Sequence, residues 1–273
     1  MFQPKITIIT CTYNSAKTLR ETLDSVKRQT FRNFEHLFID GGSTDGTLAI
    51  IKEYYEQPAL LVGKDKGLYD AFNKGLHNAT GEIVGFLHSD DIFYDEQALE
   101  RIAQAFKNEI DYYCSKMIIF DEELRKSFAV LGAKPHRQTL RDQLYSSTYF
   151  AHPTYYCTKE IIKRIGDFDL SYKIAADIDW LYRLEKTTDN FYFDDQPLIK
   201  FRGDGGTSAG NYFRGLREEF AIRFKAEGLS MSLLTVYAYH YFRRLIRYCL
   251  EVFKLNSVIA ICRKIILFGR RSK

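Results

Sequence analysis

The sequence predicts an α/β fold in which a mostly parallel, Rossmann-like central sheet is flanked by helices and followed by a helical amphipathic extension. Two patterns lead to this prediction. Over residues 1–110, short runs of β-branched and apolar residues alternate with stretches whose apolar residues recur at helical spacing. This alternation indicates βαβ units, whose strands lie parallel in one sheet. From residue 230 onward, apolar residues at helical spacing are interspersed with basic residues.

The first half is expected to alternate strictly between strand and helix. Residues 5–10 (KITIIT) are β-branched and typical of a buried strand. Asn14 or Ser15 is expected to cap the first helix, and Ser43 or Thr44 the second, because their side-chain oxygens can bind free amides at a helix start. Further strands are expected at 35–39, 59–62 and 82–87, and further helices at 68–77 and 96–106.

The second half shows a mixed pattern after residue 111. Strands are expected at 111–120, 154–157 and 198–202, and helices at 159–165, 177–186 and 212–227. A glycine-rich loop, GDGGTS, spans 203–208. We therefore expect one body at 1–228, with halves at 1–110 and 111–228, and a basic amphipathic tail at 229–273.

Charge and cysteine content limit the possible locations. The net charge is +4, but the tail holds nine Lys/Arg and one Glu, so it carries +8 and the rest carries 4 − 8 = −4. Five cysteines without a CxxC spacing indicate a reducing compartment. No signal-peptide pattern and no long charge-free apolar run is visible, so we expect a cytoplasmic protein. The acidic body argues against a nucleic-acid partner.

Acidic residues follow three of the predicted strands. Asp40 ends the second strand, Asp65 follows the third, and Asp90 and Asp91 follow the fourth. Ligands of an open α/β sheet bind beyond the carboxyl ends of its strands, so these carboxylates are expected to converge there. Adjacent carboxylates offer the oxygen ligands that Mg²⁺ or Mn²⁺ uses together with substrate phosphates. Each acid alone has a common alternative explanation as a turn or cap residue.

Five motifs resemble those of the family 2 glycosyltransferases in order and spacing. They are CTYN at 11–14, DGGSTDGT at 40–47, DKGLYDAFNKG at 65–75, TGEIVGFLHSDD at 80–91 and AADIDW at 175–180. The resemblance covers roughly residues 5–208. It implies the GT-A fold and an inverting transfer of sugar from a nucleotide sugar to an acceptor hydroxyl.

The resemblance also implies roles by position. The 1–110 half would bind the nucleotide and the 111–228 half the acceptor. Asp91, with Asp90 beside it, would hold a divalent metal, Mn²⁺ or Mg²⁺. Asp177 would be the catalytic base, with Asp179 as the less favoured choice. His152 would lie on the acceptor side, and the 203–208 loop would cover the diphosphate. The donor-binding residues would be Thr12, Tyr13, Asn14, Asp40, Asp65 and Lys74.

Substrate and location are expected from the same resemblance and from the tail. A UDP-sugar, carrying a hexose or N-acetylhexosamine, is the expected donor, and a lipid-linked glycan of surface polysaccharide assembly is the expected acceptor. A basic amphipathic helix can lie in an anionic membrane interface, so the tail is expected to bind the inner face of the cytoplasmic membrane. Alternatively, the tail packs on the body at 1–228. Two other functions stay open: a metal-dependent nucleotidyltransferase, and a membrane-docked protein that binds a nucleotide sugar without turnover.

Overall fold

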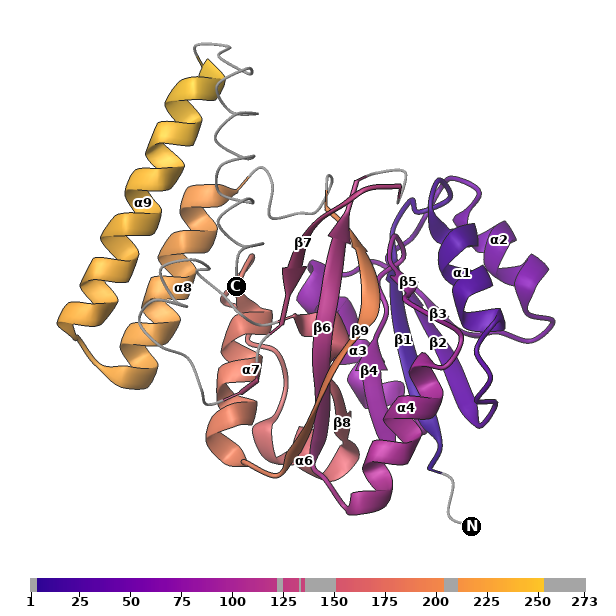
Figure 1. The fold of residues 1–273 in the computed structure, drawn as a ribbon. Coiled ribbons are helices and arrows are strands. Elements are labelled where there is room, and N and C mark those ends of the chain that lie inside the picture. The colour runs from indigo at the N-terminus through magenta and orange to yellow at the C-terminus, as the bar shows by residue number, and fades with distance from the viewer. Residues whose placement is uncertain (1–3, 122–124, 133, 136–150, 204–210, 253–273) are drawn as a thin grey trace.

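The computed structural model describes residues 4–121, 125–132, 134–135, 151–203 and 211–252. These residues form one mixed sheet with helices on both faces, and a pair of long helices lies at one side (Figure 1). The glycine-rich loop beyond Gly203 and the tail beyond Val252 lie outside the described residues.

The amino-terminal half has the predicted alternation. Its strands are parallel, and their order is β3-β2-β1-β4. The elements are β1 (Ile6–Thr12), α1 (Leu19–Lys27), β2 (Phe34–Asp40), α2 (Thr47–Tyr54), β3 (Ala59–Val62), α3 (Leu68–Asn78) and β4 (Ile83–Phe86). Because these strands are parallel, β1, β2, β3 and β4 all end at the same edge of the sheet, where the acidic residues follow.

The second half extends the sheet with mixed pairing. Beyond β4 the strand order continues β8-β6-β9-β5, with β7 paired to β6. Strand β8 is antiparallel to both neighbours, whereas β6 and β9 are parallel. The elements are β5 (Ile92–Phe93), α4 (Ala98–Ala105), η1 (Phe106–Asn108), β6 (Tyr112–Phe120), β7 (Ser127–Leu131), η2 (His152–Thr154), β8 (Tyr156–Thr158), α6 (Lys159–Ile165), α7 (Ala176–Thr187), β9 (Phe191–Arg202), α8 (Tyr212–Glu227) and α9 (Met231–Val252). The predicted fold class is confirmed.

Several predicted boundaries are wrong. Helix α1 begins at Leu19 and α2 at Thr47, so the predicted capping residues do not cap them. Asn14, Ser15 and Ser43 instead bind groups of neighbouring loops. Strands β5 and β7 were not expected, because two or five residues with little alternation give almost no periodic signal. Strand β9 begins at Phe191 rather than 198, since its polar first half pairs with β6 across a register shift.

Apolar side chains on both faces of the sheet form the core. Strand β1 lies in the centre, and its Ile6, Ile8 and Ile9 are almost fully buried. The apolar face of α1, formed by Leu19, Leu23 and Val26, is fully buried as well. Burying one such side chain stabilises the fold by about 1.5–3 kcal/mol, so the centre of the sheet is a rigid base for the loops at its edge.

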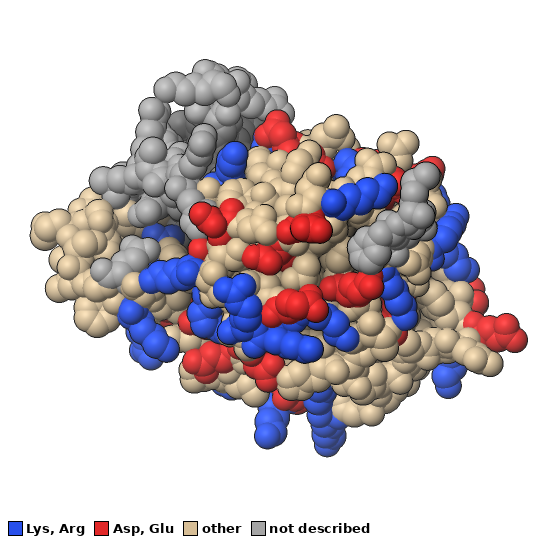
Figure 2. Space-filling model, turned by 90° about the horizontal axis from the view of Figure 1, so that it is seen from below, with Lys and Arg blue, Asp and Glu red and all other residues tan. Residues whose placement is uncertain are grey.

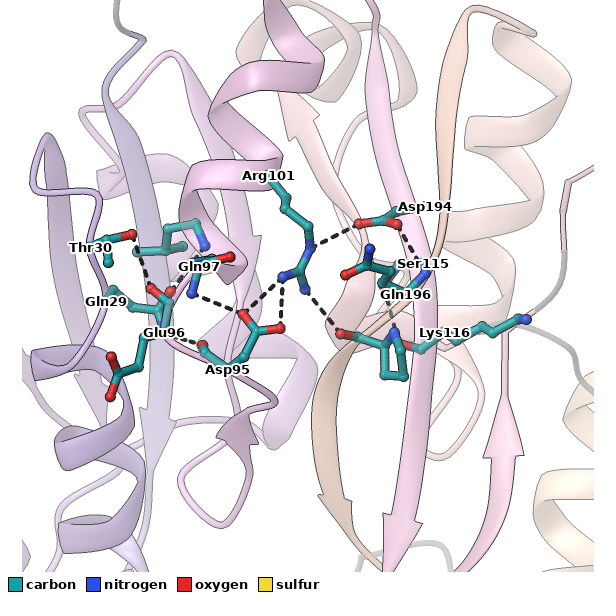
Figure 3. Close-up of polar contacts among 12 residues, drawn as sticks. Gln29, Thr30, Asp95, Glu96, Gln97, Arg101, Ser115, Lys116, Asp194 and Gln196 are labelled. Atoms are coloured by element: carbon teal, nitrogen blue, oxygen red, sulfur yellow. Dashed lines mark hydrogen bonds and ion pairs between the residues drawn. The ribbon is translucent and has the colours of Figure 1, made fainter.

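A partly buried arginine network fixes the segment after β5 and strand β9 against α4 (Figure 3). Arg101 of α4 donates two hydrogen bonds to Asp95, at 2.7 and 2.8 Å, and one to Asp194 of β9 at 3.0 Å. It also donates to the carbonyl oxygen of Pro197. Because β5 directly follows Asp91, this network holds the chain just beyond the acidic turn.

Helices α8 and α9 pack against each other beside α7. Leu233, Val236 and His240 of α9 are buried on the side that faces α8. None of the helices in the described part of the chain is long and apolar enough to cross a membrane.

Candidate active site

The loops after β1 and β2 are joined through the Asp40 carboxylate. Asp40 is fully buried, and its Oδ2 accepts hydrogen bonds from the hydroxyls of Thr12 (2.6 Å) and Ser43 (2.7 Å). Its Oδ1 accepts from the amides of Gly42 (3.0 Å) and Ser43 (2.7 Å). The carboxylate therefore shapes the 41–43 turn from within, and the predicted contact with a nucleotide base remains a prediction.

Tyr13 and Asn14 lie at the rim of these loops. Asn14 has a left-handed backbone (φ 50°), and its Oδ1 accepts from the Thr44 amide at 2.9 Å. Its own amide donates to the Ser43 hydroxyl at 2.8 Å. Tyr13 is 68% exposed, which leaves its ring free to stack on a ligand.

Asp65 and Lys74 form an ion pair next to the 41–43 turn. The Lys74 ammonium forms ion pairs with Asp65 and with Asp70, the latter at 3.2 Å. A methyl group at Gly41 would lie 3.0 Å from Asp65 Oδ2 and 3.3 Å from the Tyr13 ring. The absence of a side chain at Gly41 therefore lets Tyr13 and Asp65 approach one another.

The acidic turn after β4 is tied to both ends of the sheet edge. The Ser89 hydroxyl contacts that of Ser15 at 2.9 Å, and the Ser89 carbonyl accepts from the Thr18 hydroxyl. Asp91 Oδ1 accepts from the Arg202 amide at 3.0 Å, and the Arg202 guanidinium donates to the Asp90 carbonyl oxygen. The turn is thus fixed between the β1 loop and the end of β9.

Asp91 suits a cation. Its side chain is fully buried, and among the described residues nothing donates to Oδ2. Burial, followed by the charge of Asp90, raises the pKa of Asp91 well above its usual range. A buried oxygen without a partner is costly, and a bound cation removes that cost. The described residues hold no cluster of three or more His, Cys, Asp or Glu with metal-site geometry. The unpartnered Asp91 Oδ2, with Asp90 next to it in the chain, fits an ion held by one or two carboxylates plus a ligand's phosphates.

Asp177 and Asp179 have different environments in the first turn of α7. Asp179 is buried and pairs with Arg183 at 2.9 Å. Asp177 accepts a hydrogen bond at 2.9 Å from the Tyr69 hydroxyl, which also lies 2.8 Å from the Ile174 carbonyl oxygen. Burial raises the pKa of Asp177, although the Tyr69 hydrogen bond opposes the shift. Tyr69 belongs to α3, as does Lys74, so α3 links the two halves of the site.

His152 lies in an aromatic cluster of the core. Its ring stacks on Phe72 at a centroid distance of 5.4 Å, and Phe86, His88 and Phe168 surround it. Burial lowers the pKa of His152 to about 3, and the neighbouring His88 acts in the same direction. The ring is therefore neutral, and its predicted place on the acceptor side remains a prediction.

Three residues of this site escaped the sequence analysis. Tyr69 lies inside the motif DKGLYDAFNKG, but nothing in the sequence marks it as a hydrogen-bond partner of Asp177, which is 108 residues away. Arg202 ends a predicted strand, and only the three-dimensional pairing brings it to the acidic turn. Glu218, whose carboxylate accepts hydrogen bonds from the backbone amides of residues 173–175 just before α7, lies in the middle of a charged helix, where no local signal separates it from Glu219.

The family model described as glycosyl transferase family 2 matches residues 7–166, more than half of the chain. The chain belongs to this family. A Mycobacterium tuberculosis PGL/p-HBAD biosynthesis glycosyltransferase is 34% identical over 188 residues, which cover 67% of this chain and 70% of the relative. An uncharacterized glycosyltransferase of Rickettsia typhi is 28% identical over 230 residues, covering 81% and 71% respectively.

Solved structures share the fold of this glycosyltransferase. Staphylococcus aureus TarS, residues 1–349, superposes with a TM-score of 0.62 at 22% identity and covers 88% of this chain and 72% of that chain. The Pyrobaculum calidifontis mannosyltransferase PcManGT, solved with GDP-Man and Mn²⁺, gives a TM-score of 0.60 at 17% identity, with coverage of 96% and 81%. The GT-A architecture expected from the sequence motifs is confirmed.

Proposed function

We propose that this glycosyltransferase acts with inversion, using Asp177 to accept the proton of an acceptor hydroxyl. One observation carries the proposal: of the two carboxylates in the first turn of α7, only Asp179 is neutralised by an arginine, whereas Asp177 is oriented by a tyrosine hydroxyl. Burial raises the pKa of Asp177. A base whose pKa lies closer to the working pH accepts protons more effectively.

The reaction needs one displacement. The acceptor oxygen forms a bond to the anomeric carbon while the bond from that carbon to the nucleoside diphosphate breaks, and Asp177 takes the hydroxyl proton. Attack from the face opposite the leaving group inverts the anomeric centre. No carboxylate nucleophile is required, in contrast to a retaining glycosidase.

Asp91, with Asp90 beside it, would hold a divalent cation, Mn²⁺ or Mg²⁺. When bound, such an ion neutralises the negative charge of a diphosphate leaving group. The unpartnered Asp91 Oδ2 supports this assignment. PcManGT was solved with Mn²⁺, which is consistent with it.

The donor we propose is a UDP-sugar carrying a hexose or an N-acetylhexosamine. TarS was solved with UDP-GlcNAc and with UDP, which supports this choice. The exposed Tyr13 ring would stack on the nucleotide base. Asp65 would contact the nucleoside, and Lys74 would orient Asp65 through their ion pair.

The outer face of α9 supports attachment to a membrane and thus a lipid-linked acceptor. One face of α9 packs on α8, which agrees with the alternative expectation that the tail packs on the body. The opposite face is apolar and exposed, with Met231 at 77% and Phe242 at 62%. Figure 2, seen from below, shows one end of the molecule, at the left of the view, where the coloured residues are mostly uncharged.

Three basic residues lie near the end of α9 in the sequence. The charged residues between Met231 and Ile246 are Arg243 and Arg244, and Arg247 follows. A helix that combines exposed apolar side chains with arginines in its sequence suits an anionic bilayer interface. We therefore propose that the protein acts on the inner face of the cytoplasmic membrane, where a lipid-linked glycan of surface polysaccharide assembly would be its acceptor.

Ligand-dependent stability and turnover test the catalytic proposal. UDP with Mn²⁺ at 100 times the dissociation constant should stabilise the protein by about 2.7 kcal/mol, a rise in Tm of roughly 5–10 °C. Removing the metal with EDTA should abolish the rise. Asp91→Asn should lose it in the presence of Mn²⁺, whereas Asp177→Asn should keep it and lose only the release of UDP from UDP-sugars. A metal-independent shift, or full turnover by Asp177→Asn, would contradict the proposal.

Vesicle flotation tests the membrane assignment. The full chain should float with vesicles that contain anionic phospholipid and much less with neutral ones. Phe242→Ser combined with Leu245→Ser should reduce flotation strongly, while Ser232→Ala, an exposed change on the same helix, should not. Equal flotation of all variants, or association of the wild-type chain into dimers through α9 without lipid binding, would overturn the assignment.

A further inference from the structure

Glu218 of α8 binds the turn that leads into α7. Its Oε2 accepts hydrogen bonds from three consecutive backbone amides, those of Lys173 (3.0 Å), Ile174 (2.8 Å) and Ala175 (3.1 Å). Its Oε1 accepts from Arg214 at 2.9 Å, one helical turn earlier in α8. One carboxylate thus fixes three residues that directly precede the first turn of α7.

The close approach of α8 makes this possible. A methyl group at Gly215 would lie 3.1 Å from the Ile174 side chain, so the absence of a side chain there lets α8 approach the turn closely. The contacts also set the charge of Glu218. Burial opposes ionisation, but the hydrogen bonds from the amides and from Arg214 outweigh it and lower the pKa of Glu218. The group is ionised at neutral pH, the state that binds amides best.

The turn carries the group that orients Asp177. The Ile174 amide donates to Glu218, and the carbonyl oxygen of the same residue accepts from the Tyr69 hydroxyl. That hydroxyl also contacts Asp177. A shift of the turn would therefore move both the start of α7 and the hydroxyl that aims the carboxylate.

We infer that Glu218 is a positioning residue for Asp177, acting through the 173–175 turn and the Tyr69 hydroxyl. The inference rests on the proposed function in naming Asp177 as the base. It assigns a role to a side chain that lies outside residues 7–166, the part of the chain that the family model matches.

Two variants separate positioning from simple charge. Glu218→Ala removes the three amide contacts, so the turn should loosen, the Tyr69 hydrogen bond to Asp177 should weaken, and the pKa of Asp177 should rise. Glu218→Gln removes the same charge but keeps an acceptor oxygen, so its effect should be smaller. Arg217→Ala, an exposed charge change on the same helix, is the matched control. Among the described residues, the Tyr69 hydroxyl of α3 contacts Asp177 directly, Glu218 and Arg214 of α8 lie behind the 173–175 turn, and the Asp179–Arg183 pair lies on α7 itself.

Two readouts need no substrate. Hydrogen exchange should quicken at residues 173–175 in Glu218→Ala. The carboxyl resonance of Asp177 in ¹³C-aspartate-labelled protein, assigned with Asp177→Asn, should titrate at a higher pH. With the nucleotide sugar that the wild-type chain turns over, kcat should fall roughly 10- to 100-fold, the KM for donor should change little, and the acid limb of the kcat profile should move to higher pH.

The outcomes are distinguishable. If the wild-type chain transfers no sugar but hydrogen exchange at 173–175 and the pKa of Asp177 change in Glu218→Ala as stated, the proposed function fails. The inference that Glu218 positions Asp177 then still stands. If Asp177→Asn is inactive while Glu218→Ala keeps the wild-type exchange, pKa and kcat, the inference is overturned. Should Glu218→Ala not fold, Glu218→Gln decides: changes in the same direction support the inference, and wild-type behaviour overturns it.

Discussion

The proposed donor end and the proposed base end of this glycosyltransferase are built in different ways. At the proposed donor end, the Asp40 carboxylate accepts hydrogen bonds from its own turn and from the end of the adjacent strand β1. At the proposed base end, Asp177 is oriented by a residue 108 positions earlier, and the turn before it is held by a residue 43–45 positions later. Neighbouring loops of the amino-terminal half thus shape the surroundings of Asp40, whereas packing between distant elements shapes those of Asp177.

This difference has a consequence for mutation. A substitution at the proposed donor end should disturb one loop. A substitution at the proposed base end should disturb helices that contact several other elements. Four substitutions test this contrast between the two ends, and the largest effect is expected for the proposed base.

Asp177→Asn should lower kcat by about 10³-fold, because an amide cannot accept the acceptor's proton. Donor binding should be unchanged in a thermal-shift titration. Asp179→Asn, in which the Arg183 pair is weakened instead, should retain most of the turnover. Loss of activity in Asp179→Asn with full activity in Asp177→Asn would reverse the assignment of the base.

Asp40→Ala should lower the free energy of unfolding by about 2–3 kcal/mol, because two amides and two hydroxyls lose a buried acceptor. Asp40→Asn retains one acceptor oxygen and should cost less. Urea unfolding measures both. Since the donor loops are local, the Asp177 titration should not move in either variant, and a clear movement would show that the two ends are coupled.

Tyr69→Phe should lower kcat by about tenfold, the rate equivalent of a hydrogen bond worth about 1.4 kcal/mol. The Tyr69 hydrogen bond lowers the pKa of Asp177, so its loss should raise that pKa and move the acid limb of the kcat profile to higher pH. The same direction is expected for Glu218→Ala, which weakens this hydrogen bond indirectly. Tyr54→Phe removes another Tyr–Asp hydrogen bond, to Asp24 at 2.8 Å, and should leave the profile unchanged.

Gly41→Ala should weaken UDP binding by a few-fold, because the new methyl group would crowd Asp65 and the Tyr13 ring. Stability should change little. Gly63→Ala is a suitable control, since a methyl group there would contact nothing within 4 Å. Calorimetric titration with UDP compares the two, and equal affinities would show that Tyr13 and Asp65 do not form one pocket.

The same contrast explains how much the sequence could predict. The strands and helices of the first half were predictable, because β-branched runs and helical spacing are local signals, and parallel strand ends place Asp40, Asp65 and Asp91 at one edge. The capping residues were misjudged because Asn14 and Ser15 bind neighbouring loops instead. Strand β7, the start of β9 and the partners of Asp177 depend on packing between distant segments, which periodicity does not report.

The order in which α9, α8 and α7 pack determines how the enzyme would be oriented on a membrane. Helix α9 lies outermost, α8 beneath it, and α7 with Asp177 lies next, while α1 and α2 lie at the far side of the sheet (Figure 1). A molecule resting on a bilayer through α9 would turn its base end toward the lipid and its donor loops toward the aqueous phase. The two substrates would then arrive from different phases, one by diffusion within the membrane plane and the other through the cytosol.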